Sequence, residues 1–320
     1  MTTVANGPSF ETDALPLVSV VTASLNMGAY IEETITSVLT QDYSRIEYIV
    51  MDGGSTDGTL EILKRYDGRL RYQSEHDGGT ADAVNKGFAL ARGSVLAFLN
   101  ADDTYLPGAI AAAVSELRTD GKIAAVYGEA NWVDERGEEI SRYPTHPFNR
   151  ELLQSECFIC QPTAFFRRSV FEEVGKVNAK LHYAFDYDLW IRIAQRHEMR
   201  KINRLLATSR LHRTNKTLGE RGRALKETML LLKDRYGYVP LSWIVAYCSH
   251  LLGEKFELVP QISPSQASCG LSLPVGLFMN RQHPVQYLKD WQSLYLGALN
   301  QRLLRRRLRT EMRDRQANDR

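Results

Sequence analysis

The chain has few of the residues and motifs that mark several common protein classes. Four cysteines in 320 residues are too few for a disulfide framework. Cys157 and Cys160 form a C-x-x-C pair, but no second pair follows at zinc-ligand spacing, so we favour core packing over a metal or redox role. Residues 1–15 lack a basic segment followed by an apolar one, which argues against a secretory signal. We therefore expect the protein in the reducing cytoplasm.

Membrane-spanning runs and the common nucleotide-binding glycine motifs are also missing. Residues 239–253 include no formally charged side chain, but these 15 residues are fewer than the roughly 20 that a membrane span needs. This segment is interpreted as a core helix or, alternatively, as an interfacial helix. No G-x-G-x-x-G follows the first expected strand, and no G-x-x-x-x-G-K-[ST] occurs anywhere. Dinucleotide oxidoreductases and P-loop NTPases are thereby excluded.

A strong overall charge is absent too, since the formal net charge is +2. We expect no nucleic-acid partner. The charge is nevertheless unevenly placed, because residues 302–320 hold eight arginines against three acidic side chains. Two interpretations of this basic end stay open: a solvated helix, or a surface that contacts anionic lipid headgroups at the inner face of the membrane.

The sequence does contain a regular alternation of apolar segments in its first hundred residues. Their composition predicts strands at 18–23, 46–51, 70–73 and 95–99, with helices at 30–41, 58–66 and 80–91 between them. This order predicts an α/β fold with a mainly parallel, Rossmann-like sheet flanked by helices. Ligands of such sheets bind beyond the carboxyl ends of the strands. Those ends carry S-L-N, D-G-G-S-T-D-G, E-H-D-G-G and N-A-D-D.

The remaining pattern predicts further elements and a change of character near residue 222. We expect strands at 123–127 and 162–166, a hairpin around 135–137, and helices at 109–117, 169–175 and 187–196. Beyond residue 222, helices are expected at 224–236 and 285–309, with a linker at 261–272. The predicted organisation is an N-terminal tail (1–15), an α/β domain (16–222) and a helical C-terminal extension with a basic end (223–320).

Two acidic segments at strand ends are the first candidates for chemistry. Asp52 stands where it could accept hydrogen bonds from a base or a ribose, although its surroundings also fit a tight turn. Asn100, Asp102 and Asp103 follow the fourth strand. Adjacent carboxylates suit a hard divalent ion bound together with substrate phosphates. A solvated acidic turn is the alternative.

Several motifs in a fixed order resemble family 2 of the nucleotide-sugar glycosyltransferases, which have the GT-A fold. They are V-S-V-V-T-A-S-L-N (18–26), V-M-D-G-G-S-T-D-G-T (50–59), D-G-G-T-A-D-A-V-N-K-G (77–87) and F-L-N-A-D-D (98–103). The resemblance continues through Q-P-T-A-F-F-R-R-S-V-F-E-E-V-G (161–175), D-Y-D-L-W-I-R (186–192) and R-L-H (210–212). It covers roughly residues 16–218.

The resemblance implies donor-side roles for the residues at matching motif positions. Asn100 and Ala101 match the start of the family's D-x-D motif, and Asn100 replaces the usual first acid, which implies an altered metal affinity. Asp102 would hold the divalent metal, Mn²⁺ or Mg²⁺, that bridges the two phosphates, with Asp103 in reserve. His212 matches a position that touches the metal or the diphosphate in some relatives. Positions implied to lie beside the base or ribose are Ala23, Ser24, Asp52 and Asp82.

The resemblance also implies a catalytic base. Asp186 matches the Asp of the family's acidic E-D pair, but Phe185 replaces the preceding Glu. Asp188 is kept as an alternative base. The alternative is a purely structural role for Asp186, as the N-cap of the helix that follows it.

The function implied is inverting, metal-dependent transfer of one sugar. The donor is expected to be a UDP-sugar and the acceptor a glycan or lipid-linked hydroxyl, in surface polysaccharide, lipopolysaccharide or other glycan synthesis. The Q-x-x-R-W motif of the family's processive synthases is missing, which favours single transfer over polymerisation. A sugar-phosphate nucleotidyltransferase and a non-catalytic nucleotide- or carbohydrate-binding module are the alternatives. The first would need a basic residue in S-L-N-M-G-A-Y (24–30), where no Lys or Arg occurs.

Overall fold

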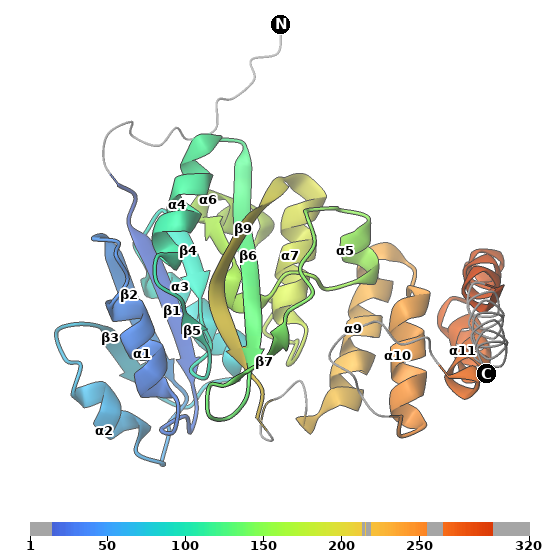
Figure 1. Ribbon diagram of the computed structural model, residues 1–320, viewed down its shortest axis with the longest axis horizontal. Helices are drawn as coiled ribbons and strands as arrows, with labels where there is room; N and C mark the ends of the chain where they lie inside the picture. Colours follow the sequence, from blue (N-terminus) through green and yellow to red (C-terminus); the bar gives the residue numbers. More distant parts are fainter. Residues whose placement is uncertain (1–14, 213–214, 216–218, 255–264, 297–320) are drawn as a thin grey trace, which may run out of the picture. The chain divides into compact units, whose positions relative to one another are not determined.

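The computed structural model describes residues 15–212, 215, 219–254 and 265–296. The chain divides into two units, Met1–Gly219 and Glu220–Arg320 (Figure 1). The first is an α/β unit and the second is helical. The predicted tail, except its last residue, and the basic end at 302–320 lie outside the described residues.

The first half of the α/β unit alternates strands and helices, as the sequence predicts. The four strands are parallel, in the spatial order β3-β2-β1-β4. Because the four strands are parallel, their carboxyl ends all lie at one edge of the sheet. The elements are β1 (Val18–Ser24), α1 (Ile31–Leu39), β2 (Ile46–Asp52), α2 (Thr59–Lys64), β3 (Arg71–Ser74), α3 (Thr80–Leu90) and β4 (Val95–Phe98).

The second half extends the sheet with strands of mixed direction. Within the described residues the sheet has nine strands in the order β3-β2-β1-β4-β8-β6-β9-β5, with β7 paired to β6. Strand β8 runs antiparallel to β4 and β6, whereas β9 is parallel to β6. The elements are β5 (Thr104–Tyr105), α4 (Ala109–Thr119), β6 (Ile123–Val133), β7 (Glu139–Arg142), α5 (Leu152–Ser155), the 3₁₀ turn η1 (Gln161–Thr163), β8 (Phe165–Arg167), α6 (Arg168–Val174), α7 (Phe185–Arg196) and β9 (Glu198–Arg210).

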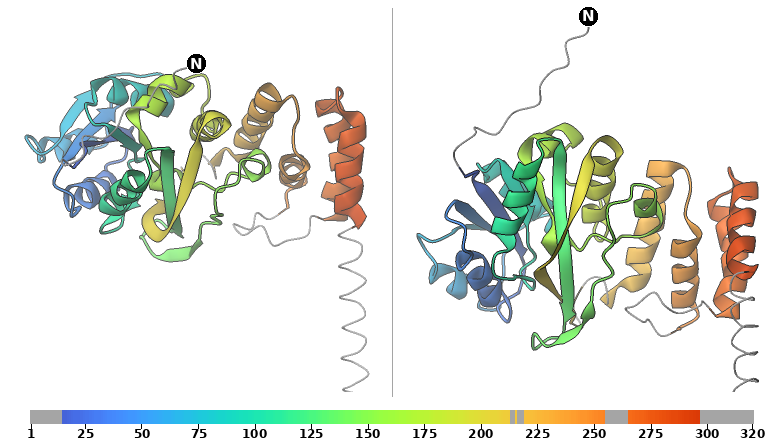
Figure 2. Two further views of the ribbon diagram at one scale, coloured as in Figure 1. Left: turned by 90° about the horizontal axis from the view of Figure 1, so that it is seen from above. Right: turned by 45° about the horizontal axis from the view of Figure 1, so that its top comes forward.

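Helices cover both faces of the sheet, which explains why the side chains of β4 (V-L-A-F) are apolar and buried throughout (Figure 2). Val20 of β1 belongs to a core cluster with side chains of α1 and α4. On the opposite face, Phe88 of α3 contacts Phe98 and Phe166 edge to face, and Phe166 also contacts Trp190 of α7. This two-sided core fixes the strand ends from which the site is built.

A buried carboxylate ties the strands together at their amino ends, away from that edge. Glu47 accepts hydrogen bonds from the Ser19 hydroxyl at 2.5 Å, from Arg71 at 2.9 Å and from the Arg92 side chain at 2.9 Å. Burial raises the pKa of Glu47, but the hydrogen bonds from Ser19 and Arg92 and the charge of Arg71 outweigh it, so the pKa is lowered overall. This cluster is therefore a source of stability.

The helical unit contains α9 (Arg221–Tyr236), α10 (Leu241–Leu251), α11 (Gln266–Met279) and a helix at 284–296. Its core cluster includes Met229, Ile244, Cys248 and Tyr287. Ile244 and Cys248 belong to the uncharged stretch at 239–253, so its interpretation as a core helix fits the structure. None of the helices in the described residues is long and apolar enough to cross a membrane.

Two expected elements differ from the structure. The linker predicted at 261–272 is wrong from Gln266 on, where α11 begins; Ser265 caps this helix by accepting a hydrogen bond from the Ser268 N–H at 3.0 Å. The strand predicted at 162–166 begins as η1 and becomes β8 only at Phe165. The helix predicted at 285–309 is present at 284–296, and its remainder lies outside the described residues.

Candidate active site

The carboxyl ends of β1, β2 and β3 place three polar residues side by side. In the parallel register Ser24 pairs with Asp52, and Asp52 pairs with Ser74. The Asp52 carboxylate accepts hydrogen bonds from the N–H groups of Gly54 and Ser55 at 3.1 and 2.9 Å, and from the hydroxyls of Ser55 and Ser74 at 2.5 and 2.6 Å. Asp52 therefore fixes the loop after β2, with most of its acceptor capacity already used.

Ser24 differs from Asp52 in its hydrogen bonding. Its residue is 5% exposed, and its hydroxyl has no hydrogen-bond partner within the described part of the chain. A buried polar group without a partner costs about 1–3 kcal/mol, so a ligand group that reaches this hydroxyl would recover that cost. Ala23, the preceding residue of β1, is only partly buried. The Ser24 hydroxyl at the end of β1 can thus still form a hydrogen bond, at the place where the sequence predicts that the nucleotide sugar binds.

Asp82 lies in the first turn of α3. Its carboxylate accepts a hydrogen bond from the Gly78 N–H at 3.0 Å and lies 3.4 Å from the Lys86 ammonium. The Gly78 hydrogen bond is the largest cause of its lowered pKa. Asp82 therefore stays ionised and holds the Gly-rich loop before α3.

The acidic turn after β4 is largely buried rather than solvated. Asp102 is 8% exposed and Asp103 is 3% exposed. The Asn100 amide donates to Asp103 at 3.2 Å and to Gln161 at 3.0 Å. The Thr34 hydroxyl contacts the backbone oxygens of residues 101 and 103 at 2.9 and 2.8 Å. Ala101 itself is 1% exposed, so it sets the shape of the turn with its backbone.

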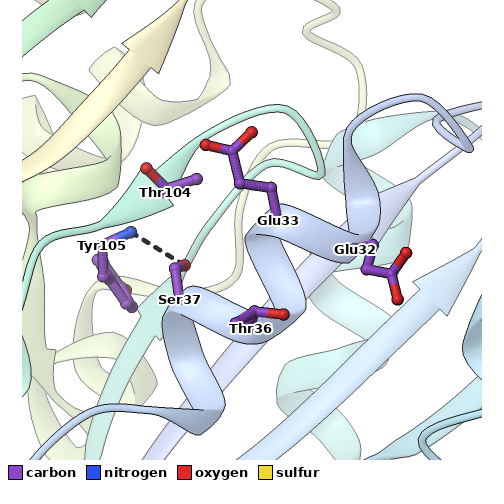
Figure 3. Close-up of a pocket in the computed structure, with 6 residues that line it drawn as sticks. All are labelled: Glu32, Glu33, Thr36, Ser37, Thr104 and Tyr105. Carbon is purple, nitrogen blue, oxygen red and sulfur yellow. Dashed lines mark hydrogen bonds between the residues drawn. The ribbon is translucent and has the colours of Figure 1, made fainter.

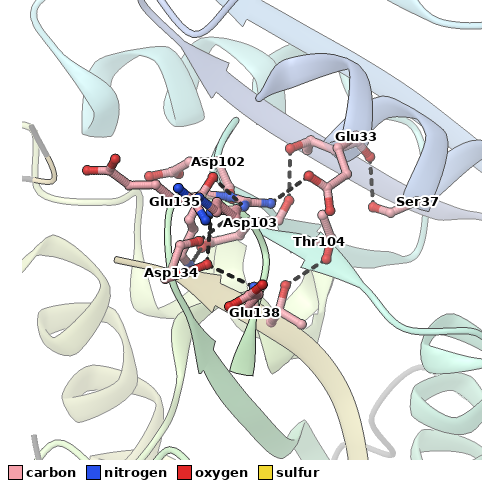
Figure 4. Close-up of polar contacts among 12 residues, drawn as sticks. Glu33, Ser37, Asp102, Asp103, Thr104, Asp134, Glu135 and Glu138 are labelled. Atoms are coloured by element: carbon pink, nitrogen blue, oxygen red, sulfur yellow. Dashed lines mark hydrogen bonds and ion pairs between the residues drawn. The ribbon is translucent and has the colours of Figure 1, made fainter. Parts of the chain in front are cut away.

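Arg210, at the end of β9, also contacts this turn. It belongs to R-L-H (210–212), but the sequence alone assigns no role to it. Its side chain is 2% exposed, and its guanidinium donates to the backbone oxygen of Asp102 at 3.1 Å and to the Glu33 carboxylate at 2.6 Å. It also donates to the backbone oxygens of Asp134 and Glu135 at 3.2 and 3.3 Å. Figure 4 shows these acidic residues converging from α1, the acidic turn and the β6–β7 connection. Arg210 thus links β9 to three other segments: α1, the acidic turn and the β6–β7 connection.

His212 and Asp102 form the pair that the sequence predicts as metal ligands. His212 Nε2 lies 2.9 Å from Asp102 Oδ2, and His212 is 4% exposed. The Tyr30 ring lies 5.1 Å from the imidazole, and the Arg210 guanidinium lies 5.0 Å from the same Tyr30 ring. Tyr30 therefore fills the space between the two basic side chains and limits how His212 can turn.

His212 and Asp102 are hydrogen-bonded to each other in the structure, and the same two atoms could serve as ligands of one divalent ion. Two ligands that lie ~2.1 Å from one ion at right angles are about 3.0 Å apart, close to the separation of His212 Nε2 and Asp102 Oδ2. Within the described ranges no three His, Cys, Asp or Glu side chains form a complete metal site. Phosphate oxygens and water would therefore have to complete the coordination, as they do for ions bound together with a nucleotide.

Asp103 is less suited to hold a metal than Asp102. Burial, followed by the charge of Asp102, raises the pKa of Asp103 well above its ordinary range. Its Oδ1 accepts a hydrogen bond from the backbone N–H of Arg210 at 2.9 Å, and its Oδ2 accepts one from the Asn100 side-chain amide. Both oxygens are thus engaged in holding the turn.

Asp186, the predicted base, lies on the first turn of α7 and is only partly buried. The helix N-cap is Ala184, so the N-cap alternative for Asp186 does not describe its position. Burial raises the pKa of the Cys160 thiol, and the charges of Asp103 and Asp186 raise it further. Asp103 and Asp186 are therefore both close enough to Cys160 to affect its thiol.

Asp188, the alternative base, has a structural environment instead. It is fully buried and forms an ion pair with Arg192 at 2.9 Å. Arg192 also donates to the backbone oxygens of Val174 and Gly175 at 2.6 and 2.8 Å. Asp188 therefore anchors α7 to the end of α6, which leaves Asp186 as the better-placed carboxylate.

Of the C-x-x-C pair, Cys160 is buried and Cys157 is partly buried. Cys157 and Cys160 are free thiols, and Cys160 is 3% exposed. Burial is the largest cause of the raised pKa of both thiols, and the charge of Asp186 adds to it. Thiols of this kind are poor metal ligands and nucleophiles.

A pocket with a volume of about 440 Å³ opens between α1 and β5 (Figure 3). None of the residues predicted for the site lines it. Glu33 connects the two regions, because it lines the pocket and pairs with Arg210. The lining residues are Glu32, Glu33, Thr36, Ser37, Thr104 and Tyr105.

Comparison with known sequences identifies proteins that are similar to this chain. Residues 19–175 match the family described as glycosyl transferase family 2. Chondroitin synthase of Escherichia coli is 30% identical over 208 residues, which make up 64% of this chain and 30% of that protein. Hyaluronan synthase of Pasteurella multocida is 28% identical over 212 residues, which make up 65% of this chain and 22% of that protein. The chain thus spans less than a third of either relative.

Solved structures with a similar fold cover most of the chain. TarS of S. aureus, residues 1–349 in complex with UDP-GlcNAc, has a TM-score of 0.58 at 14% identity, over 88% of this chain and 92% of that one. The mannosyltransferase PcManGT from Pyrobaculum calidifontis, in complex with GDP-Man and Mn²⁺, has a TM-score of 0.55 at 19% identity, over 91% and 88%. At these identities the likeness shows the fold, and the predicted GT-A fold is confirmed.

Proposed function

Because the chain belongs to glycosyl transferase family 2, we propose that it transfers one sugar, with inversion, from a UDP-sugar to an acceptor hydroxyl. The observation that carries this proposal is the buried pair of Asp102 and His212, whose Oδ2 and Nε2 atoms lie 2.9 Å apart at the acidic turn after β4. A UDP-GlcNAc complex among its structural neighbours supports the choice of nucleotide. We assign catalysis to residues 16–222 and treat 223–320 as an extension.

The proposed reaction is a single in-line displacement. The Asp186 carboxylate takes the proton of the acceptor hydroxyl while that oxygen forms a bond to C1 of the sugar and the bond from C1 to the nucleoside diphosphate breaks. Such general base assistance contributes about 10²–10⁴-fold. The Tyr187 N–H donates to Asp186 Oδ1 at 2.7 Å, which orients the carboxylate.

The donor side is assigned to the strand ends and the acidic turn. We propose that Ser24 and the loop fixed by Asp52 receive the base and ribose, and that Asp102 and His212 hold Mn²⁺ or Mg²⁺ at the diphosphate. When bound, such an ion offsets the negative charge that develops on the leaving diphosphate. The Mn²⁺ complex of PcManGT supports this assignment. Arg210 and Tyr30 keep Asp102 and His212 in position.

The acceptor is assigned more broadly. Two relatives are glycan synthases by name, which supports a glycan or lipid-linked acceptor in polysaccharide or other glycan synthesis. Because the Q-x-x-R-W motif is missing, we propose transfer of a single sugar per acceptor.

UDP release tests the proposal directly. The protein is incubated with Mn²⁺ and a panel of UDP-sugars, with GDP-mannose as the contrasting donor, and free nucleotide diphosphate is measured. We expect release from a UDP-sugar. Absence of binding to every donor would overturn the proposal. Donor binding without nucleotide release would favour a non-catalytic module, and pyrophosphate formed from UTP and a sugar phosphate would identify a nucleotidyltransferase.

Two substitutions separate the two acids. Asp186→Asn should abolish transfer and leave donor binding nearly intact, whereas Asp102→Ala should weaken binding of the metal and donor together. Asp67→Asn is the matched control, because this exposed carboxylate lies between α2 and the amino end of β3, away from the carboxyl ends of the strands. Transfer by Asp186→Asn at the rate of the unmodified protein would show that the base is another residue.

A further inference from the structure

An aromatic side chain, Trp132, lies at the carboxyl end of β6, next to the strand end that carries the metal-binding pair. Strand β6 pairs in parallel with β9 up to its last residue, Val133 (Figure 1). The Leu211 N–H then donates to the backbone oxygen of Val133 at 2.8 Å, and His212 is the next residue of the chain. Trp132 is therefore held close to the place where His212 contacts Asp102.

Strand β7 adds a second ring to Trp132. In the antiparallel pairing of β6 with β7, Trp132 lies opposite Ser141, and Tyr143 follows two residues later on the same face of the hairpin. The backbone N–H of Tyr143 still donates to the Ala130 oxygen, at 2.9 Å. The ring centroids of Trp132 and Tyr143 are 5.0 Å apart, and the ring planes meet at 59°. Both residues are only partly buried, so this aromatic pair can be reached from solvent.

Tyr143 connects the aromatic pair to the proposed base. Its hydroxyl donates to the backbone oxygen of Cys157 at 2.7 Å, and the Tyr187 hydroxyl donates to that of Leu153. The short segment around α5 thus contacts both Tyr143 and the first turn of α7, on which Asp186 lies. Burial is the largest cause of the raised pKa of Tyr143, and the charge of Asp186 is among those that add to it. The aromatic pair therefore lies between the two acidic parts of the site.

The aromatic pair also offers a hydrogen-bond donor. Within the described residues the Trp132 indole N–H donates to no group, and unlike that of Trp190 it is not enclosed. Aromatic faces with a few polar groups beside them are typical of small-molecule sites. A sugar suits such a surface, because its ring has apolar C–H faces and a rim of hydroxyls. The pair is thus chemically matched to a carbohydrate ring.

The charge around the aromatic pair narrows the class of sugar. Residues 129–142, which include the hairpin, contain five acidic side chains against two basic ones. One of the two, Arg142, is already paired with Glu129 at 2.5 Å. A phosphate or carboxylate placed on the pair would therefore meet an excess of negative charge. This disfavours a lipid phosphate or a uronic acid at this position and favours an uncharged sugar.

We propose that Trp132 and Tyr143 stack against an uncharged sugar ring, the terminal unit of the acceptor glycan, and present its hydroxyl to Asp186. A ring held there lies between the metal-binding pair and the base, which is where an in-line displacement needs the acceptor. This inference rests on the proposed function, because it names the acceptor of the same site. The stacking itself needs no turnover and is measured by binding.

Saturation-transfer NMR of the full chain with UDP and Mn²⁺ tests the inference. The probes are the methyl β-glycosides of glucose, galactose and N-acetylglucosamine, with methyl β-glucuronide as the anionic contrast. We expect transfer to the ring protons of an uncharged glycoside and less transfer to the glucuronide. Trp132→Ala should weaken glycoside binding about tenfold, and Trp132→Phe should restore most of it. Tyr66→Ala is the matched control, because this partly buried ring lies between α2 and β3 and its hydroxyl donates to Glu32.

Several outcomes would overturn the inference: no binding of any glycoside, equal binding to Trp132→Ala and the unmodified chain, or a preference for the glucuronide. Calorimetry with UDP shows that each variant is folded; if Trp132→Ala is not, Trp132→Leu keeps an apolar side chain and gives the same comparison. UDP binding also separates the two hypotheses. Binding of UDP without glycosides would leave the proposed transfer standing and place the acceptor elsewhere. Binding of glycosides at Trp132 without any nucleotide would refute the transfer and leave a carbohydrate-binding surface.

Discussion

Arg210 is the side chain whose replacement should disturb the acidic turn most. Its guanidinium donates to the backbone oxygens of Asp102, Asp134 and Glu135 and to the carboxylate of Glu33. The substitution Arg210→Met keeps an unbranched apolar chain in the buried space and removes all four contacts. It therefore isolates what the guanidinium does.

The contacts set the expected magnitude. Each buried carbonyl that loses its donor costs about 1–3 kcal/mol. Of the three carbonyls, that of Asp102 is buried and loses its donor, whereas that of Asp134 keeps the Gly137 N–H at 3.0 Å and Glu135 is exposed to water, so we expect a loss of about 1–3 kcal/mol in all. Glu33 adds little, because its side chain is 59% exposed and can return to water. A domain with the usual stability of about 5–15 kcal/mol stays folded after such a loss.

The site should suffer more than the fold. Side chains that support a metal ligand are worth about 10–100-fold in metal affinity, and Arg210 holds the backbone of Asp102. We therefore expect binding of Mn²⁺ and UDP to Arg210→Met to weaken by about tenfold or more. Arg210→Lys should recover only part of this loss, because an ammonium cannot reach the four acceptors together.

Hydrogen exchange followed by mass spectrometry is the suitable assay, because it reports on the two units separately. Titration calorimetry with Mn²⁺ and UDP measures the site. Arg200→Met is the matched control: Arg200 is 39% exposed, pairs with Glu116, and should change stability by less than about 0.5 kcal/mol. If Arg210→Met matches this control in both measurements, the reasoning about the acidic turn is refuted.

The remaining predictions concern four other features. Glu47→Gln should reduce stability at neutral pH but not in acid: the folded state lowers the pKa of Glu47, so its contribution is present above the ordinary value of 4.5 and lost as pH falls; equal losses of melting temperature at both pH values would contradict this. Tyr30→Leu should weaken Mn²⁺ and UDP binding about tenfold in calorimetry with the melting temperature almost unchanged, and unchanged affinity would remove Tyr30 from the support of His212. Asp188→Asn should cost about 3–5 kcal/mol in denaturant unfolding because it breaks a buried ion pair, and a loss of turnover without a loss of stability would make Asp188 a candidate base again. Cys157 and Cys160 should resist a disulfide reagent in the native state, because burial raises the pKa of both thiols; rapid labelling would show that the thiols are accessible.

The sequence predicts the parallel half of the fold well, because its strands and helices carry their own periodic signals. The long strand β9 was missed for a physical reason. Within Glu198–Arg210, five formally charged residues interrupt the apolar pattern, and the strand is held by its parallel pairing with β6 rather than by its own composition. A pairing partner about 75 residues earlier in the chain leaves no local signal.

The candidate site also combines residues that the sequence could predict with residues that only the fold brings together. Asp52, Asp102 and Asp186 could be predicted because each stands at a fixed place in a motif. The roles of Arg210 and Tyr30 could not, because these depend on contacts made only in the fold; Arg210 and its partner Glu33 are 177 residues apart. Arg210 belongs to the R-L-H motif (210–212), but the motif alone does not show which groups its side chain contacts.

The replacement of the first acid of the D-x-D pattern by Asn100 makes physical sense in this environment. Asp102 and Asp103 already place two carboxylates in a buried turn, where burial and then the charge of Asp102 raise the pKa of Asp103. A third carboxylate at position 100 would add to this repulsion and could not donate to Asp103 and Gln161, as the Asn100 amide does. The amide thus stabilises the turn in which Asp102 is left to pair with His212. The proposed mechanism accordingly assigns metal binding to one carboxylate, Asp102, and one imidazole, His212.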